Sequence, residues 1–198
     1  MAATRRYCPG CHYPATVCIC DALHTLKARQ KIIILQHPGE VKHAKNTTRL
    51  ITLCMPDITV LRGEQPDSFS QLIKQCGKTP DRFALFYPST SSKAVEDHSH
   101  QFALPNQKTL IFIDATWRKA FKIWQLNPWL RALPQWHFAA PPASSYRIRK
   151  TSVDNGLSTL EALAYTLSIT EKLDCQPLLQ SFAAMQEKVF SLAIANED

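Results

Sequence analysis

Two stretches of this sequence carry residue types that can do chemistry. The first holds four of the seven cysteines of the chain: two residues separate Cys8 from Cys11, and one residue separates Cys18 from Cys20. The second is the motif Asp-Ala-Thr-Trp at residues 114–117, which directly follows an apolar run. Clustered thiolates typically bind a metal, whereas a carboxylate at the end of an apolar strand is well placed to act on a ligand.

The cysteine spacing predicts a structural zinc site. Two cysteines separated by two residues present thiolates at a separation that suits tetrahedral zinc, and a second close pair completes four ligands. The chain begins without the apolar core of a secretory signal, and in a reducing compartment such clustering favours a metal over disulfides. Because four protein ligands leave no open position, we assign this zinc to folding or RNA docking. Unligated thiols, or a redox pair of Cys8 and Cys11, are the alternatives.

The composition favours a polyanionic partner. The chain has 23 Lys and Arg against 16 Asp and Glu, a formal charge of +7, and neutralising phosphates with such cations releases counterions. A generally basic surface with no nucleic-acid role is the alternative. No apolar run approaches the roughly 20 residues that a transmembrane helix needs. We therefore expect a cytoplasmic protein without membrane association; the sequence leaves its oligomeric state open, with a monomer favoured.

Local reasoning gives Asp114 two interpretations. It can cap the helix that follows, by accepting a backbone N–H of the first turn, and Trp117 can be an ordinary packing residue. The functional interpretation comes from the helix itself, in which cations and aromatic residues are interleaved: Arg118, Lys119, Lys122, Trp124 and Trp129. Cations beside aromatic rings suit phosphates and unstacked bases.

The elements that would position these residues alternate between strands and helices. Apolar runs predict strands over residues 31–36, 58–61, 82–87 and 108–113, and helical spacing predicts helices over 44–55, 69–75, 116–125, 157–173 and 177–195. Apolar strands separated by helices predict an α/β fold, with a mainly parallel sheet and helices on both faces. We expect a Cys-rich zinc-binding head at residues 1–26 and a catalytic domain at residues 27–198.

Three of the predicted strands run directly into polar sequences. These are residues 37–40 (His-Pro-Gly-Glu), residues 87–89 (Tyr-Pro-Ser) and the motif at 114–117. Ligands of parallel sheets bind beyond the carboxyl ends of the strands, so these sequences should share one rim. The five glycines form neither a G-x-G-x-x-G motif nor a P-loop, which excludes the usual dinucleotide and nucleoside-triphosphate cradles.

At this point the sequence resembles the DTW-domain family, which includes tRNA-uridine aminocarboxypropyltransferases. Six motifs carry the resemblance, in the family's order, from about residue 5 to 190: the four cysteines, His37 to Glu40, Tyr87 to Ser89, Asp114 to Trp117, Tyr146 to Arg149, and Leu157 to Ala162. One Asp-x-Thr-Trp motif alone would be weak evidence, whereas six ordered motifs are specific.

The resemblance implies a fold similar to the SPOUT superfamily, with a knotted C-terminal region that binds S-adenosylmethionine. The implied reaction transfers the 3-amino-3-carboxypropyl group to N3 of a tRNA uridine, in the variable loop, and releases methylthioadenosine. An S-adenosylmethionine-dependent RNA methyltransferase and a non-catalytic, zinc-containing RNA-binding protein are the alternatives.

In this family context, we assign the chemistry to Asp114, Thr116 and Trp117. Asp114 would be the general base that accepts the proton of uridine N3, because a positioned carboxylate can do so. Burial makes a carboxylate more basic, and Trp117 is the apolar neighbour expected to bury it. The alternative role of Asp114 is to hold the amino group of the donor.

The remaining expected contacts fall into two sets. Donor contacts are assigned to His37, Glu40, Tyr87, Pro88, Ser89, Asp114, Ser158, Thr159 and Glu161. RNA contacts are assigned to Lys42, Lys45, Arg49, Arg118, Lys119, Lys122, Tyr146, Arg147, Arg149 and Lys150. Ser158 with Glu161 is also a capping pattern, which is structural in most proteins. His37 can be a turn residue, Arg147 or Arg149 can hold the donor's carboxylate, and the lysines can form a solvated face.

Overall fold

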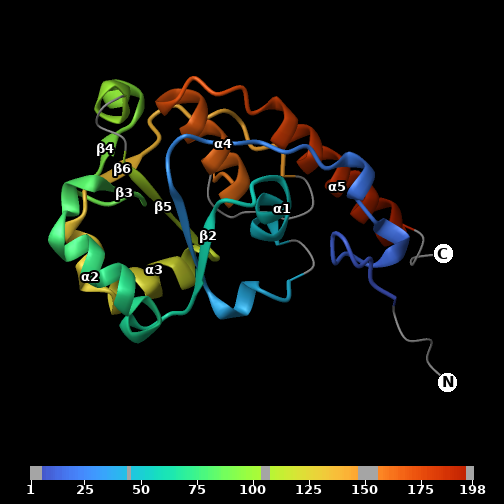
Figure 1. Ribbon diagram of the computed structural model, residues 1–198, viewed down its shortest axis with the longest axis horizontal. Coiled ribbons are helices and arrows are strands. Elements are labelled where there is room, and N and C mark those ends of the chain that lie inside the picture. Colours follow the sequence, from blue (N-terminus) through green and yellow to red (C-terminus); the bar gives the residue numbers. More distant parts are fainter. Residues whose placement is uncertain (1–5, 44–45, 104–107, 147–155, 195–198) are drawn as a thin grey trace.

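A computed structural model of the chain has a single six-stranded sheet at its centre (Figure 1). It describes residues 6–43, 46–103, 108–146 and 156–194, with side chains up to residue 188. The strand order is β2-β1-β5-β3-β6-β4, and every pair of neighbouring strands is parallel. The predicted α/β fold with a mainly parallel sheet is therefore confirmed.

The sheet contains the four predicted strands and two more. The strands are β1 (Ile32–Gln36), β2 (Thr59–Arg62), β3 (Phe83–Phe86), β4 (Lys93–Ala94), β5 (Thr109–Asp114) and β6 (Gln135–His137). The sequence did not predict β4 and β6, because strands of two and three residues are too short to show an apolar period. Both owe their conformation to the strands beside them.

All five predicted helices are present, with ends that differ by a few residues. They are α1 (Thr47–Cys54), α2 (Ser70–Lys78), α3 (Trp117–Leu126), α4 (Thr159–Thr170) and α5 (Gln176–Ile194). Short 3-10 helices occupy several connections, including Glu96–Phe102. None of the described helices is both long and apolar enough to cross a membrane.

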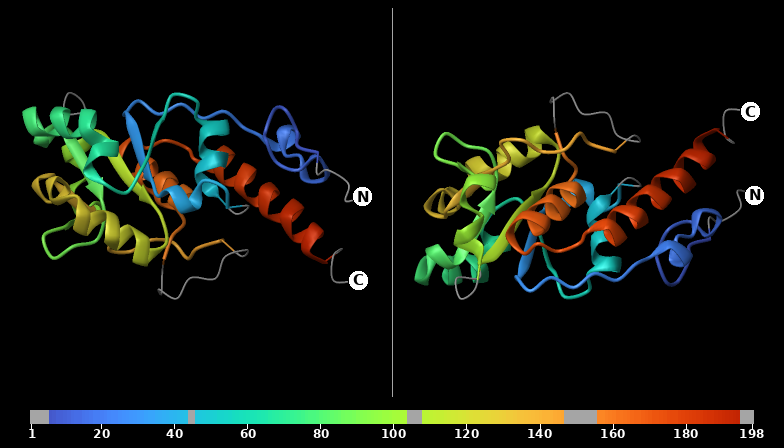
Figure 2. Two further views of the ribbon diagram at one scale, coloured as in Figure 1. Left: turned by 90° about the horizontal axis from the view of Figure 1, so that it is seen from below. Right: turned by 90° about the horizontal axis from the view of Figure 1, so that it is seen from above.

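Helices cover both faces of the sheet (Figures 1 and 2). Alternate residues of the central strands point to opposite sides: Ala84 and Leu110 join one core with α1, α4 and α5, while Leu85 and Ile111 join the other with α2 and α3. A strand that is buried on both faces must be apolar throughout, which is the pattern that predicted these strands.

The Cys-rich segment lies along α5 (blue beside red in Figures 1 and 2). The Lys188 ammonium of α5 donates to the Cys18 carbonyl and to the Asp21 carboxylate, each at 2.6 Å. Val17 and Ile19 are buried in the same core as α5. The segment therefore packs onto the helix directly, and its division from the rest of the chain at residue 26 stays a prediction.

Candidate active site

A cavity of about 850 Å³ opens at the carboxyl ends of β3, β5 and β6. Residues that follow these three strands line it, together with the start of α4. Its polar lining includes Tyr87, Ser89, Asp114, His137, Ser158 and Thr159. This volume lies within the range of roughly 300–1,000 Å³ that is usual for small-molecule and cofactor sites. Two of the three sequences expected at one rim, residues 87–89 and 114–117, therefore meet at this cavity.

Asp114 ends β5 and is held by two side chains from other elements. Its Oδ2 accepts a hydrogen bond from Gln36 Nε2 at 2.8 Å, and its Oδ1 accepts one from Thr159 Oγ1 at 2.7 Å. The residue that caps α3 is Thr116, with no hydrogen bond from its side chain. The interpretation of Asp114 as a helix cap is therefore wrong: its carboxylate joins β5 to β1 and α4.

Although the cation Arg118 also lines the cavity, no ion pair among the described residues balances the charge of Asp114. The residue is 7% exposed and lines the cavity, and within the described part of the chain it forms no ion pair with a lysine or arginine. Burying an unpaired carboxylate is costly. A cationic group bound in the cavity would offset that cost, so the site favours a positively charged ligand.

Gln36 is the site residue that sequence reasoning missed most clearly. It is 2% exposed, and its Nε2 also lies 3.4 Å from Asn46 Oδ1. Asn46 caps α1 by accepting from the Arg49 N–H at 3.2 Å, and its Nδ2 donates to the Glu40 carbonyl at 3.0 Å. A hydrogen-bonded chain thus joins the carboxylate to α1. The available signal was a glutamine at the end of an otherwise apolar strand.

The start of α4 forms one wall of the cavity. Ser158 and Glu161 make a reciprocal capping box: Ser158 Oγ accepts from the Glu161 N–H at 3.3 Å, and Glu161 Oε2 accepts from the Ser158 N–H at 2.8 Å. Glu161 also accepts from the Ser145 N–H at 2.6 Å and from Ser144 Oγ at 2.9 Å. Ser158 and Thr159 line the cavity, whereas Glu161 does not and instead holds the segment at residues 144–145.

The residues after β3 form the opposite wall. Tyr87, Pro88 and Ser89 all line the cavity. The Tyr87 ring stacks on Trp124 of α3 with ring centroids 4.9 Å apart, and burial raises the pKa of Tyr87. The Ser89 hydroxyl donates to Gln135 of β6. These contacts fix the position of the wall. Because its pKa is raised, the Tyr87 hydroxyl stays protonated at neutral pH.

His37 and Glu40 lie outside the cavity lining, although both were expected to contact the donor. His37 Nε2 is 2.7 Å from a Glu64 carboxylate oxygen, and its Nδ1 accepts from the Gly39 N–H at 2.9 Å. Glu40 is 4% exposed, and its Oε1 lies 2.8 Å from the Lys119 ammonium of α3. Both residues therefore tie the turn after β1 to neighbouring elements.

Several basic residues expected to bind RNA have partners within the chain. Lys119 pairs with Glu40, and Lys122 pairs with Glu64 at 2.8 Å while its side chain stays 60% exposed. The Arg49 guanidinium lies over the Tyr13 ring, 5.1 Å from its centroid.

The other residues expected to bind RNA are distributed around the site. Lys42 and Arg118 are exposed, and Tyr146 lines the cavity with its ring centroid 5.2 Å from that of Phe182. Four further residues lie outside the described residues: Lys45, Arg147, Arg149 and Lys150.

Glu96 supports the wall that follows β6, and the sequence did not single it out. Its carboxylate accepts from the N–H groups of Ala139 and Ala140, at 3.0 and 3.2 Å, and from the Tyr165 hydroxyl at 3.1 Å. Partial burial acts to raise the pKa of Glu96, but these donors outweigh it and hold the pKa below its ordinary value. Ala139 lines the cavity, so Glu96 anchors its lining from behind.

The four cysteines of the N-terminal segment lie together. Their sulfur atoms all fall within 4.8 Å of one another, with separations of 3.4 Å for Cys8–Cys18, 3.6 Å for Cys8–Cys20 and 3.8 Å for Cys11–Cys18. Zn–S bonds of about 2.3 Å in a tetrahedron place neighbouring sulfurs about 3.8 Å apart. The cluster therefore matches the dimensions of a zinc site.

The surroundings of the cluster also suit thiolate ligands. The N–H groups of Cys11 and Gly10 hydrogen-bond to the Cys8 sulfur and lower the pKa of Cys8 to about 6. The neighbouring thiols, Cys18 first, raise the pKa of Cys20 to about 12, so four thiolates need a cation among them. A Cβ at Gly10 would lie 3.1 Å from the Cys20 sulfur, so a larger residue there would press on the cluster.

Comparisons with known proteins place this geometry in context. A family model described as the DTW domain matches residues 5–190. The protein named tRNA-uridine aminocarboxypropyltransferase 2 of Drosophila melanogaster is 33% identical over 172 residues, 84% of this chain and 67% of that protein. The protein of the same name in Macaca fascicularis is 31% identical over 180 residues, 86% of this chain and 58% of that protein.

The match to a plant relative covers a shorter part of the chain. The protein named tRNA-uridine aminocarboxypropyltransferase A of Arabidopsis thaliana is 30% identical over 131 residues, 59% of this chain and 49% of that protein. The chain thus spans between about half and two thirds of the length of these relatives. No solved structure shows a significant match to the chain.

Proposed function

The chain belongs to the DTW-domain family, and from that premise we propose that it is a tRNA-uridine aminocarboxypropyltransferase. The reaction would move the 3-amino-3-carboxypropyl group of S-adenosylmethionine to N3 of a uridine in the variable loop of tRNA. The observation that carries the proposal is the buried Asp114 carboxylate, which lines a cavity of cofactor size without a cationic partner among the described residues.

The cavity suits the proposed donor in size and in charge. S-adenosylmethionine carries a sulfonium and an ammonium, both of which an unpaired carboxylate attracts. Apolar lining residues such as Phe112 and Leu157 suit an adenine ring. We assign donor contacts to the lining residues Tyr87, Pro88, Ser89, Asp114, Ser158 and Thr159. His37, Glu40 and Glu161 would support the site from outside the cavity.

The donor would supply a sulfonium-activated carbon, so that attack by uridine N3 forms a C–N bond, breaks a C–S bond and releases methylthioadenosine. The N3 proton must leave, and we assign its acceptance to Asp114. Each carboxylate oxygen can accept two hydrogen bonds, so the bonds from Gln36 and Thr159 leave room for this proton. Thr116 and Trp117 line the same cavity as Asp114 and would shape its mouth.

The RNA would approach over α3 and the Tyr146 side of the cavity. The formal charge of +7 favours a polyanion, and Arg118 and Lys122 are exposed on α3. The cysteine cluster would hold structural zinc and stabilise the segment packed on α5. A monomeric state and a cytoplasmic location, where tRNA and reducing conditions occur, belong to the same proposal.

We also propose that the C-terminal region is knotted, as in SPOUT-like proteins. Membership of the DTW-domain family supports this. The division into a head at 1–26 and a catalytic domain at 27–198 is part of the same proposal.

The by-product of turnover tests the reaction. With tRNA and S-adenosylmethionine, the protein should release methylthioadenosine in step with loss of unmodified uridine. Release of S-adenosylhomocysteine would instead identify a methyltransferase. Binding of tRNA with neither by-product would identify a non-catalytic RNA-binding protein.

A further inference from the structure

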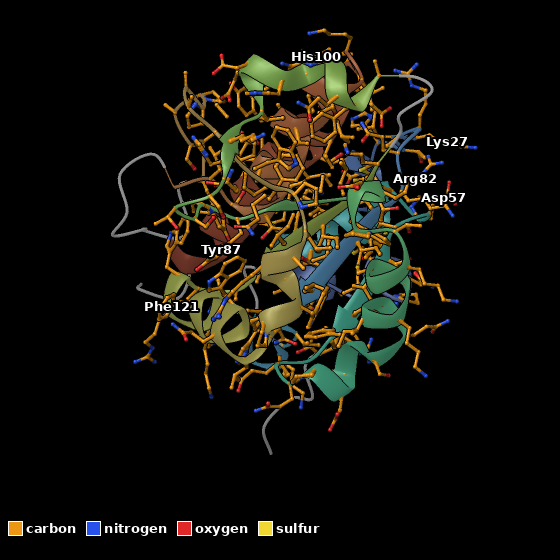
Figure 3. All side chains as sticks on the ribbon, turned by 90° about the vertical axis from the view of Figure 1, so that its left-hand side faces the viewer. Lys27, Asp57, Arg82, Tyr87, His100 and Phe121 are labelled. Atoms are coloured by element: carbon orange, nitrogen blue, oxygen red, sulfur yellow. The ribbon has the colours of Figure 1, made fainter. Side chains whose placement is uncertain are left out.

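Two large aromatic side chains are exposed on α3. Trp117 is 43% exposed and Phe121 is 53% exposed, and they are one helical turn apart, so they lie on the same face. Figure 3 shows Phe121 at the outer edge of the molecule, on the same side as Tyr87. Trp117 also lines the cavity, so this exposed surface continues from the mouth of the site along the helix.

Neither aromatic residue belongs to the core that α3 forms with the sheet. α3 attaches to the sheet through Ala120 and Ile123, which are buried in the core shared with α2. Trp117 and Phe121 lie outside this core, on the exposed surface of the helix. Exposed aromatic residues that continue from a cavity typically mark a binding surface.

The same face carries positive charge. Arg118 and Lys122 follow Trp117 and Phe121 directly, so aromatic and cationic side chains alternate along the exposed face. In the part of the chain that is described, Arg118 forms no ion pair, and Lys122 pairs with Glu64 only at the surface. Alternating rings and cations suit a single strand of nucleic acid, whose bases stack while its phosphates pair with the cations.

We propose that Trp117 and Phe121 stack on unpaired RNA bases next to the nucleotide that enters the cavity. This rests on the proposed function for the identity of the RNA, and it adds a positioning role for Phe121 and a requirement for single-stranded RNA. A base-paired stem has no free ring faces to offer to these side chains, so the surface selects a loop.

Binding of a labelled single-stranded oligouridine, followed by fluorescence anisotropy, tests the proposal without any turnover. Phe121→Leu keeps an apolar, helix-forming side chain but removes the ring, and it should weaken binding roughly tenfold. Phe121→Tyr should bind as the unchanged protein does. Gln125→Leu, one turn further along the exposed face, is the matched control and should have no effect.

The salt dependence separates stacking from charge. Phe121→Leu should leave the slope of log affinity against log salt unchanged, whereas Lys122→Gln should reduce it. Equal binding by Phe121→Leu and the unchanged protein would overturn the proposal, as would equal affinity for the oligouridine and a base-paired stem. If the ring is needed for binding but no aminocarboxypropyl product forms, the proposed reaction fails while the stacking surface stands.

Discussion

Gln36 and Asp114 are direct partners in the parallel register of β1 and β5, and the amide of Gln36 donates to the carboxylate of Asp114 at 2.8 Å. The amide fixes the position of the carboxylate but brings no charge. A lysine or arginine in its place would form an ion pair and make the carboxylate a weaker base. A neutral partner at this position therefore preserves both uses proposed for Asp114, as a base and as a partner for a cationic donor.

Replacement of Gln36 should impair the site more than the fold. Gln36→Leu leaves Asp114 Oδ2 without its donor, and an unsatisfied buried group costs about 1–3 kcal/mol of stability. We expect kcat to fall at least about tenfold, because a misplaced base transfers protons less effectively. Kinetics with saturating tRNA and chemical unfolding measure the two effects.

Gln30→Leu is the matched control for this replacement. Gln30 is 5% exposed and donates to Thr170, away from the cavity. This variant should lose stability but keep the kcat of the unchanged protein. Similar kcat values for the two variants would show that Gln36 has no particular role at the site.

Asp114→Asn should distinguish the two roles of the carboxylate. The change removes the negative charge and keeps the shape. If Asp114 is the base, kcat should fall at least about a hundredfold, as general-base catalysis typically contributes 10²–10⁴-fold, and this fall should exceed any loss of donor affinity measured by calorimetry. A fall in donor affinity that accounts for the whole loss of activity would instead identify Asp114 as the anchor of the amino group. Activity equal to that of the unchanged protein would contradict both.

Most of the fold was predictable from the sequence, because its longer strands are continuous apolar runs and its helices have apolar residues at helical spacing. The strand at 108–113 and the helix at 157–173 are examples, and both occur with ends shifted by a few residues. β6 could not be predicted, because its three residues owe their conformation to pairing with β3. The order of the strands in the sheet could not be predicted either, because it depends on contacts between residues that are distant in the sequence.

The candidate site was predictable where a motif follows a strand. Asp114 and Tyr87 both line the cavity, as their places after predicted strands suggested. Gln36 and Glu96 were missed because their roles arise only when the chain folds and brings partners close to them. The pairing of Glu40 with Lys119, 79 residues away, could not be predicted for the same reason.

Removal of zinc should loosen the N-terminal segment. Four thiolates without a cation repel one another, so a strong chelator, or Cys18→Ser, should lower Tm and increase hydrogen exchange around residues 6–22 and in α5, which Lys188 joins to that segment. Cys76→Ser, which alters a buried cysteine outside the cluster, is the control for general destabilisation. The purified protein should contain one zinc per chain; a metal-free protein with the same Tm would contradict the assignment.

Glu96 should make stability depend on pH in the acid range. Its pKa lies below the ordinary value of 4.5, so its contribution is fully present above that value and is lost as the pH falls through the lowered pKa. Glu96→Gln should therefore be less stable than the unchanged protein at neutral pH, and the difference should shrink in acid. Urea unfolding of both proteins across this range measures it; a difference that is constant with pH would contradict the role of the ionised carboxylate.

Mass spectrometry of the nucleosides of tRNA, after incubation with the protein and S-adenosylmethionine, tests the central claim most directly. The account predicts a uridine that has gained a 3-amino-3-carboxypropyl group, and predicts that Asp114→Asn slows this gain at least about a hundredfold. A uridine that has gained only a methyl group, or tRNA that is bound but unmodified, would contradict it.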